Sequence, residues 1–201
     1  MNTVVSRAAI SCVAFTLASS CTSLAAAHEK DLRTQTDAAG ETEISFCSRP
    51  SPDSFGFPGH AFVAFSERPP GKPRVFRAVG HTIGPSTSTP STVFTYFGGA
   101  AVSGQQAEER YTHMKQACLT VKVDRAVYVQ ALAAARPTLS MVGVPDALAA
   151  SAERYSLNAN DCIDFALKVA QPIRAKGLIV PTRTPTDLPS TYVRKLIDAN
   201  I

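Results

Sequence analysis

The sequence predicts an α+β domain in which a small antiparallel sheet packs against helices. Two apolar strand candidates, residues 60–67 and 73–79, flank a Pro-Pro-Gly-Lys turn, and this arrangement predicts a β-hairpin. An amphipathic helix is predicted from Cys162 onward, because apolar residues follow the cysteine at i+3, i+4 and i+7. The chain of 201 residues, 45% of them hydrophobic, suits one domain with a sizeable core.

The first 27 residues have the pattern of an export signal. They carry one charge, Arg7, then the apolar run AAISCVAFTLA, and they end in small residues at Ala27. The run is too short and too interrupted to span a membrane. We therefore expect cleavage near Ala27 and an exported protein. An alternative is a lipoprotein signal with lipidation at Cys21, in the stretch LASSC.

Charge and hydropathy argue against nucleic-acid binding and against a membrane-spanning segment after the signal. The net charge of +4 falls to +3 when Arg7 is removed, and no basic run is present, so nucleic-acid binding is not expected. No other segment resembles a membrane span, and no repeat or second domain boundary is visible. The expected organisation is a signal at 1–27, a polar flexible lead at 28–41 and one domain at 42–201.

The remaining elements follow from local patterns along the chain. Pro, Gly, Ser and Thr are concentrated at 48–59 and 82–92, which are expected to be loops. Residues 138–152 have no clear pattern. Further strands are predicted at 42–47, 93–99 and 118–123, and further helices at 105–117, at 124–135 and near the C-terminus.

The hairpin brings two histidines into the same region of the sheet. If the turn is centred on Pro70 and Gly71, His60 faces His81 across the two strands. A slip of one residue would place Gly80 there instead and turn the opposing side chain to the other face. Proximity of His60 and His81 is therefore one of two possible registers.

Three cysteines remain after the signal: Cys47, Cys118 and Cys162. An oxidising compartment tends to pair thiols, and an odd number leaves one unpaired. We expect a Cys47–Cys118 disulfide with Cys162 free. The alternative is that all three are reduced and buried.

Cys162 begins its predicted helix directly after Asn160 and Asp161, which are typical capping residues. The positive end of the helix dipole favours a thiolate. The N–H groups at Asp161 and Cys162 are also candidates for binding an oxyanion. The competing interpretation is that Cys162 is one more buried cysteine.

An imidazole near Cys162 would complete a thiol nucleophile. His60 begins a strand just after a Gly/Pro loop, and His81 is the second candidate, whereas His113 lies on a charged segment and is expected to be solvated. Taken alone, His60 is more simply interpreted as a packed histidine whose ring nitrogens are hydrogen-bonded to the backbone. His60, His81 and Cys162 could bind zinc, but the chain lacks closely spaced CxxC or HxxxH motifs, so no metal or cofactor is expected.

Several motifs resemble the circularly permuted papain-like superfamily, which includes permuted NlpC-type proteins and lecithin:retinol acyltransferase-like proteins. In that group the histidine strand precedes the cysteine helix. The similarity covers roughly residues 42–195. The stretches that carry it are GHAFVAF, LTVKVDRAVYVQAL, YSLNANDCIDFALKVA and GLIVPTRTPTDLPSTYVRKL.

The resemblance implies a role for each candidate residue. Cys162 would be the nucleophile, His60 the general base and His81 the third polar residue. Arg77 is the other polar side chain on the strand of His81, but it can only donate hydrogen bonds and would orient an imidazole poorly. Asp161 stands where the family often has Asn directly before the cysteine.

The implied protein is a monomeric, periplasmic or secreted cysteine hydrolase that needs no cofactor. It would cleave an amide, such as a peptide bond in peptidoglycan, through a thioester intermediate. Two alternatives remain: a thiol acyltransferase acting on an acyl substrate, and an envelope binding or structural protein that keeps this fold without catalysis.

Overall fold

The computed structural model describes residues 27–34, 40–52, 56–135, 151–157 and 159–201. The expected signal at 1–27, with Cys21, lies outside the described residues except for Ala27, which begins β1. The strands are β1 (Ala27–Asp31), β2 (Glu41–Ser51), β3 (Gly56–Arg68), β4 (Val75–Ile83), β5 (Val102–Glu108), β6 (Ala117–Lys122) and β7 (Ser151–Tyr155). The α-helices among the described residues are α1 (Thr89–Tyr96), α2 (Arg125–Ala134), α4 (Cys162–Arg174) and α5 (Pro189–Asp198).

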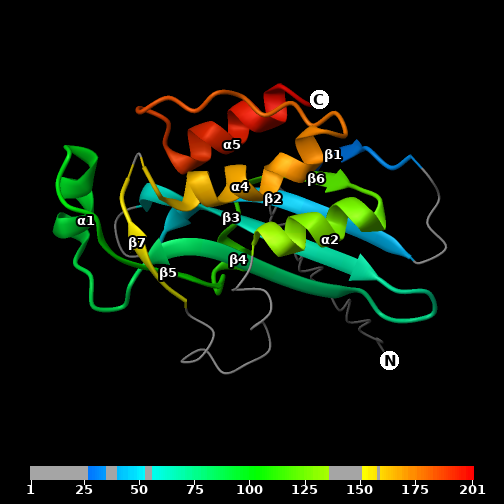
Figure 1. Cartoon of the computed structure of the whole chain (residues 1–201), viewed down its shortest axis with the longest axis horizontal. Coiled ribbons are helices and arrows are strands. Elements are labelled where there is room, and N and C mark those ends of the chain that lie inside the picture. The colour runs from blue at the N-terminus through cyan, green and yellow to red at the C-terminus, as the bar shows by residue number, and fades with distance from the viewer. Residues whose placement is uncertain (1–26, 35–39, 53–55, 136–150, 158) are drawn as a thin grey trace, which may run out of the picture.

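The described strands form one seven-stranded sheet in the order β1-β6-β2-β3-β4-β5-β7. Neighbouring strands are antiparallel except β1 and β6, which are parallel. Helices α2, α4 and α5 lie together over one side of the sheet, and α1 stands apart at one end (Figure 1). This arrangement confirms the predicted α+β class.

The hairpin of β3 and β4 forms around the expected turn, where Lys72 N–H donates to the Pro69 carbonyl. Val63 pairs with Val79, which is one residue away from the register that would set His60 opposite His81. The same register, extended along both strands, would set Ala61 opposite His81. Since side chains alternate along a strand, this single step places His81 on the face of Ala61 and no longer on a face shared with His60.

The strands bury side chains on both faces. The large core cluster joins inner strand residues to the helices and includes Ala61, Val63 and Cys162. A smaller cluster contains Cys47, Phe62, Ala64 and Ala78, with Cys118 packed against it. Residues 61 and 63 thus belong to a different cluster from residues 62 and 64, as strand alternation requires.

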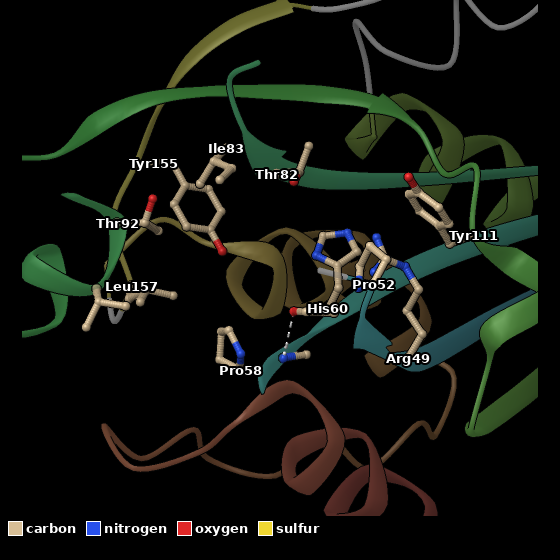
Figure 2. Close-up of a pocket in the computed structure, with 13 residues that line it drawn as sticks. Arg49, Pro52, Pro58, His60, Thr82, Ile83, Thr92, Tyr111, Tyr155 and Leu157 are labelled. Carbon is tan, nitrogen blue, oxygen red and sulfur yellow. Dashed lines mark hydrogen bonds between the residues drawn. The ribbon is translucent and has the colours of Figure 1, made fainter. Parts of the chain in front are cut away.

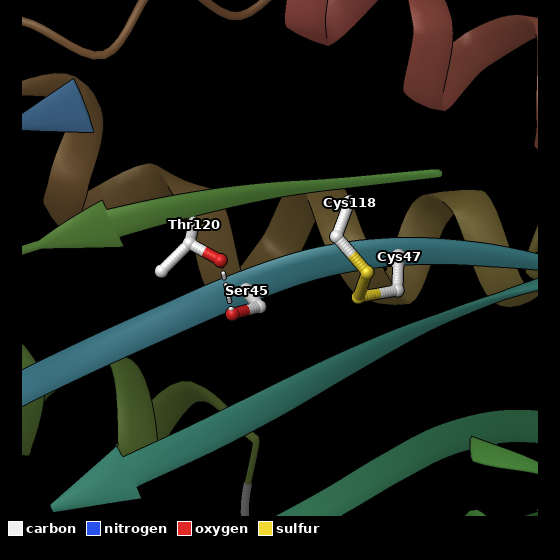
Figure 3. The surroundings of a disulfide bond; sticks show 4 residues. All are labelled: Ser45, Cys47, Cys118 and Thr120. Carbon is white, nitrogen blue, oxygen red and sulfur yellow. Dashed lines mark hydrogen bonds between the residues drawn. A yellow bond between two sulfur atoms is a disulfide. The ribbon is translucent and has the colours of Figure 1, made fainter. Parts of the chain in front are cut away.

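The predicted disulfide is confirmed: Cys47 on β2 is bonded to Cys118 on β6 with an S–S distance of 2.03 Å. The two residues are paired directly across the antiparallel ladder. Beside them, the hydroxyls of Ser45 and Thr120 form a hydrogen bond of 2.8 Å (Figure 3). Cys162 is the free cysteine of the described chain.

Two predicted elements have the opposite type of secondary structure. Residues 93–99 were expected to form a strand but belong largely to α1, because Ser88 caps its N-terminus and Pro90 lies in its first turn. Residues 105–117 were expected to be helical, yet their first part lies in β5, between β4 and β7. Non-local strand pairing here overrides a weak helical pattern.

The segment expected to be a flexible lead, 28–41, contains a strand. Its first residues lie in β1, which pairs with β6 at the edge of the sheet, and Lys122 binds Glu29 at 2.9 Å. Pairing with an exposed edge stabilises residues that have little apolar surface of their own. At the other edge, β7 occupies residues 151–155, at the end of a stretch without a clear sequence pattern. Residues 138–150 lie outside the described residues.

We expect the disulfide to contribute about 4 kcal/mol to the free energy of unfolding, because it closes a loop between residues 71 positions apart. The double variant Cys47→Ser/Cys118→Ser should lose this amount in urea denaturation. Adding a reductant should destabilise the unmodified protein and leave the double variant unchanged. Equal stability of the oxidised and reduced unmodified protein would contradict the expectation.

Candidate functional site

The first turn of α4 is closed by a capping box made of two carboxylates. Asp161 Oδ1 accepts hydrogen bonds from the N–H groups of Ile163 (2.8 Å) and Asp164 (3.2 Å). Asp164 Oδ2 accepts in return from the N–H group of Asp161 (3.2 Å). The N–H groups of Asp161, Ile163 and Asp164 are therefore occupied, which leaves less of this helix end for an oxyanion than the sequence suggested.

A buried arginine neutralises the two capping carboxylates. Arg183 Nη2 lies 2.5 Å from Asp161 Oδ2, and Arg183 Nη1 lies 2.6 Å from Asp164 Oδ2. The Arg183 side chain is 11% exposed and that of Asp161 is 4% exposed. The pair with Asp161 is largely shielded from solvent, whereas the Asp164 side chain is 31% exposed, and together the two pairs hold the extended segment around Arg183 against the start of α4.

Cys162 is enclosed by protein, with 2% of its surface exposed. Its thiol shares a hydrogen bond with the Tyr155 hydroxyl and interacts with the backbone N–H of Ala61. Burial, reinforced by the Asp161 carboxylate, raises the pKa of Cys162 from 9.0 to about 12. The helix dipole does not overcome these two effects, so the resting group is a thiol.

Tyr155, at the end of β7, lies between the thiol and the nearby imidazole of His81. Its ring stacks edge-on against that of His81, with 5.1 Å between ring centroids. Burial raises the pKa of Tyr155 well above its ordinary value, so its hydroxyl keeps its proton. Tyr155 is thus a neutral hydrogen-bonding partner for Cys162.

His81 is enclosed, with 1% of its surface exposed, and its Nε2 atom has no hydrogen-bond partner. This atom lies 4.0 Å from Glu153 Oε2, which is too long for a hydrogen bond. Burial lowers the pKa of His81, and the charge of Glu153 and the backbone carbonyl of Asp161 oppose that effect. An unsatisfied buried nitrogen is unusual and marks this position as a candidate for function.

His60 belongs to a second polar group, formed with Arg49 and Glu109. Its Nε2 lies 3.4 Å from Glu109 Oε2, and Arg49 Nε lies 3.1 Å from Glu109 Oε1. Burial lowers the pKa of His60 from 6.5 to about 4, although the charge of Glu109 opposes this shift. The His60 imidazole is therefore neutral at pH 7 and able to accept a proton.

Gly80 makes room for the His60 ring. A Cβ atom at this position would lie 2.4 Å from His60 Nε2, closer than van der Waals contact allows. Any side chain at Gly80 would displace the imidazole from Glu109. The position therefore requires glycine for space rather than for backbone freedom.

A pocket of about 270 Å³ connects these groups. Figure 2 shows His60 on one side of it and the hydroxyl of Tyr155 pointing toward the same space. Its walls also include residues of the β2 end, the β4 end, α1 and the segment after β7. The lining residues are Arg49, Ser51, Pro52, Pro58, Gly59, His60, Thr82, Ile83, Thr92, Val93, Tyr111, Tyr155 and Leu157.

The structure brings together some predicted site residues and separates others. Cys162, Asp161 and His81 meet around Tyr155. His60 follows the alternation of Phe62 and is held by Glu109, and no hydrogen bond joins Cys162 to either imidazole in the described residues. The pocket reaches both groups, since His60 and Tyr155 line it.

Several residues of the site were not singled out from sequence, among them Glu109, Tyr155 and Arg183. Glu109 falls in a stretch expected to be helical, so nothing connected it with His60. Tyr155 begins the motif that contains Cys162, and its aromatic ring could have been noted there. Arg183 follows an extended apolar stretch, and no local pattern links it to Asp161.

Comparison of the chain with protein-family models, curated proteins and solved structures finds no match. Within the described residues, no group of three or more His, Cys, Asp and Glu side chains is arranged to hold a metal ion. None of the described helices combines the length and the apolar character needed to cross a bilayer.

Replacing Arg183 with Met should lower the free energy of unfolding by about 3 kcal/mol, because Asp161 would stay buried without a counter-ion. Urea denaturation at pH 7 measures the effect. Arg174→Met, which removes an exposed arginine from the far end of α4, is the matched control and should change stability little. Similar losses in both variants would show that the Arg183 ion pairs are not responsible.

His60 should make the protein sensitive to acid between pH 6.5 and 4. The unfolded chain binds a proton near pH 6.5, whereas the folded protein resists protonation of this imidazole until about pH 4. Stability is therefore unaffected above pH 6.5 and falls as the pH drops through this window. The urea midpoint of the unmodified protein should decline more steeply there than that of His60→Gln. Equal slopes would contradict the expectation, since His81 is present in both proteins.

Proposed function

We propose that this chain is an exported cysteine hydrolase of circularly permuted papain-like fold, in which Cys162 is the nucleophile. The observation that carries the proposal is the position of the free cysteine. It starts a capped helix and is hydrogen-bonded to Tyr155, which lines a pocket together with the neutral imidazole of His60. The order of a histidine strand before a cysteine helix, with the helix packed on the sheet, fits that fold.

His60 is the better candidate for the general base. It lines the pocket, it is neutral at pH 7, and its Nε2 faces Glu109, which leaves Nδ1 available to accept a proton. Glu109 would act as a positioning residue that orients the ring, in place of the His81 expected from sequence. His81 instead packs on Tyr155 and supports the cysteine side of the pocket.

The raised pKa of Cys162 and the lowered pKa of His60 indicate that both groups are neutral in the resting protein. In the proposed mechanism His60 takes the thiol proton while sulfur attacks the carbonyl carbon of an amide, and a C–S bond forms. The imidazolium then gives this proton to the departing amine as the C–N bond breaks. The imidazole then deprotonates a water molecule, whose oxygen attacks the thioester carbonyl. The C–S bond breaks, a carboxylic acid leaves, and the imidazolium returns its proton to the Cys162 sulfur.

A substrate can reach the thiol of Cys162 only if the side chain of Tyr155 moves away from it. Its hydroxyl is hydrogen-bonded to Cys162, and its ring forms part of the pocket wall. A substrate carbonyl in the pocket could replace the thiol as the partner of this hydroxyl. Tyr155 would then donate to the developing oxyanion, supplementing a helix end whose N–H groups are largely engaged by Asp161 and Asp164.

A second candidate function is binding without catalysis, and the burial and high pKa of Cys162 favour it. In that case the pocket would hold an envelope peptide, and the cysteine would be part of the core. The two functions differ in what happens to Cys162 when ligand is present.

The test is turnover of peptidoglycan stem peptides and small ester substrates, followed by mass spectrometry of the products and of the intact protein. Cys162→Ala should abolish cleavage and any thioester adduct. His60→Gln should lower the rate by at least about 100-fold, because it removes the base. His81→Gln, at the other buried histidine, is the matched control and should retain more activity than His60→Gln.

Folding of each variant is checked by circular dichroism, so that loss of activity is not confused with loss of structure. Iodoacetamide labelling of Cys162 provides a second readout. Absence of cleavage, together with a cysteine that is modified only after unfolding, would overturn the hydrolase proposal and support binding.

A further inference from the structure

Helix α1 carries an exposed group of apolar side chains, here called the aromatic surface: Val93, Phe94, Tyr96 and Phe97. Their exposed fractions are 37%, 65%, 38% and 75%. The rings of Tyr96 and Phe97 contact each other edge-on, with centroids 5.3 Å apart, and Phe94 lies against Gly99. Exposed apolar side chains that cluster in this way mark an interaction site more often than scattered ones do.

The segment that carries the aromatic surface has no charged side chain. Residues 84–101 contain no Asp, Glu, Lys, Arg or His over 18 positions. Its polar groups are largely satisfied internally: the hydroxyls of Thr92 and Thr95 donate to backbone carbonyls, and Gly99 N–H donates to Phe94. Such a segment loses little hydration when it enters a medium of low dielectric constant.

The position of α1 favours a bilayer over a protein partner. The helix stands apart at one end of the sheet (Figure 1). A stable protein interface buries about 800 Å² on each partner, which an isolated helix of eight residues does not readily supply. A bilayer accommodates a small group of apolar side chains, and Tyr and Phe side chains suit its interface with water.

The net charge of the chain agrees with a negatively charged membrane surface: it is +4, or +3 without Arg7. Arg154 lies at the base of the segment, next to Glu153, and its guanidinium donates to the Ala101 carbonyl at 3.3 Å. Anionic headgroups would therefore add an electrostatic attraction to the burial of the aromatic rings.

We propose that the aromatic surface inserts into the interfacial layer of a lipid bilayer that contains anionic lipid. Thr92 and Val93 of the same helix line the pocket, and Thr95 accepts a hydrogen bond from the N–H of Leu157, another lining residue. Insertion of α1 thus brings the pocket to the membrane surface. The inference stands whether or not Cys162 is catalytic.

The absence of tryptophan from the chain permits a reporter specific to one position. In Phe97→Trp, vesicles of phosphatidylglycerol and phosphatidylethanolamine should shift the emission to shorter wavelength, and brominated lipid should quench it. Phe76→Trp, at a side chain 50% exposed on β4, is the matched control and should show neither effect. The comparison remains valid if the apolar segment 1–27 binds vesicles, because that would affect both variants.

Adding Phe94→Ser to the Phe97→Trp protein should raise the lipid concentration for half-maximal shift about tenfold, since one aromatic ring no longer inserts. Adding Phe76→Ser instead should leave it unchanged. Replacing phosphatidylglycerol with phosphatidylcholine should weaken the response. An absent shift, equal shifts in both reporters, or a concentration-dependent shift without vesicles would overturn the proposal, the last by showing self-association.

Discussion

The paired carboxylates of Asp161 and Asp164, held by Arg183, are the constraint on which the site depends. A helix that starts beneath protein needs partners for its first N–H groups, and water is not available there. Asp161 supplies the acceptor, and Arg183 supplies the positive charge that makes a buried carboxylate tolerable. The position of Cys162, the first residue of α4, follows from this capping of the helix N-terminus.

The same capping arrangement at the start of α4 determines the chemistry available to Cys162. A carboxylate beside the thiol opposes its ionisation, and it also occupies donors that would otherwise face a substrate. The Asp161 carboxylate thus stabilises the start of the helix but disfavours the thiolate form of Cys162. A reaction at Cys162 therefore needs a base during the attack and a donor from outside the helix, which are the roles we assign to His60 and Tyr155.

The parts of the fold that depend on local pattern were predictable. The hairpin around Pro70, the helix after Cys162 and the Cys47–Cys118 bond follow from turn chemistry, periodicity and cysteine number. The partners of His60 were not predictable, because Glu109 reaches it only through the placement of β5 in the sheet. A turn pattern alone also cannot specify the register of β3 and β4 to one residue. The relative placement of His60 and His81 was therefore not predictable.

The disulfide has a consequence for when this chain can reach its folded state. Strands β2 and β6 are adjacent in the sheet but far apart in sequence, so their pairing carries a large loop-closure cost. A covalent bond between directly opposed residues permits a single alignment of the two strands and removes most of that cost from later refolding. In a reducing compartment the bond is absent. Oxidation of the two thiols would then be the step that completes maturation, and it would require an oxidising compartment.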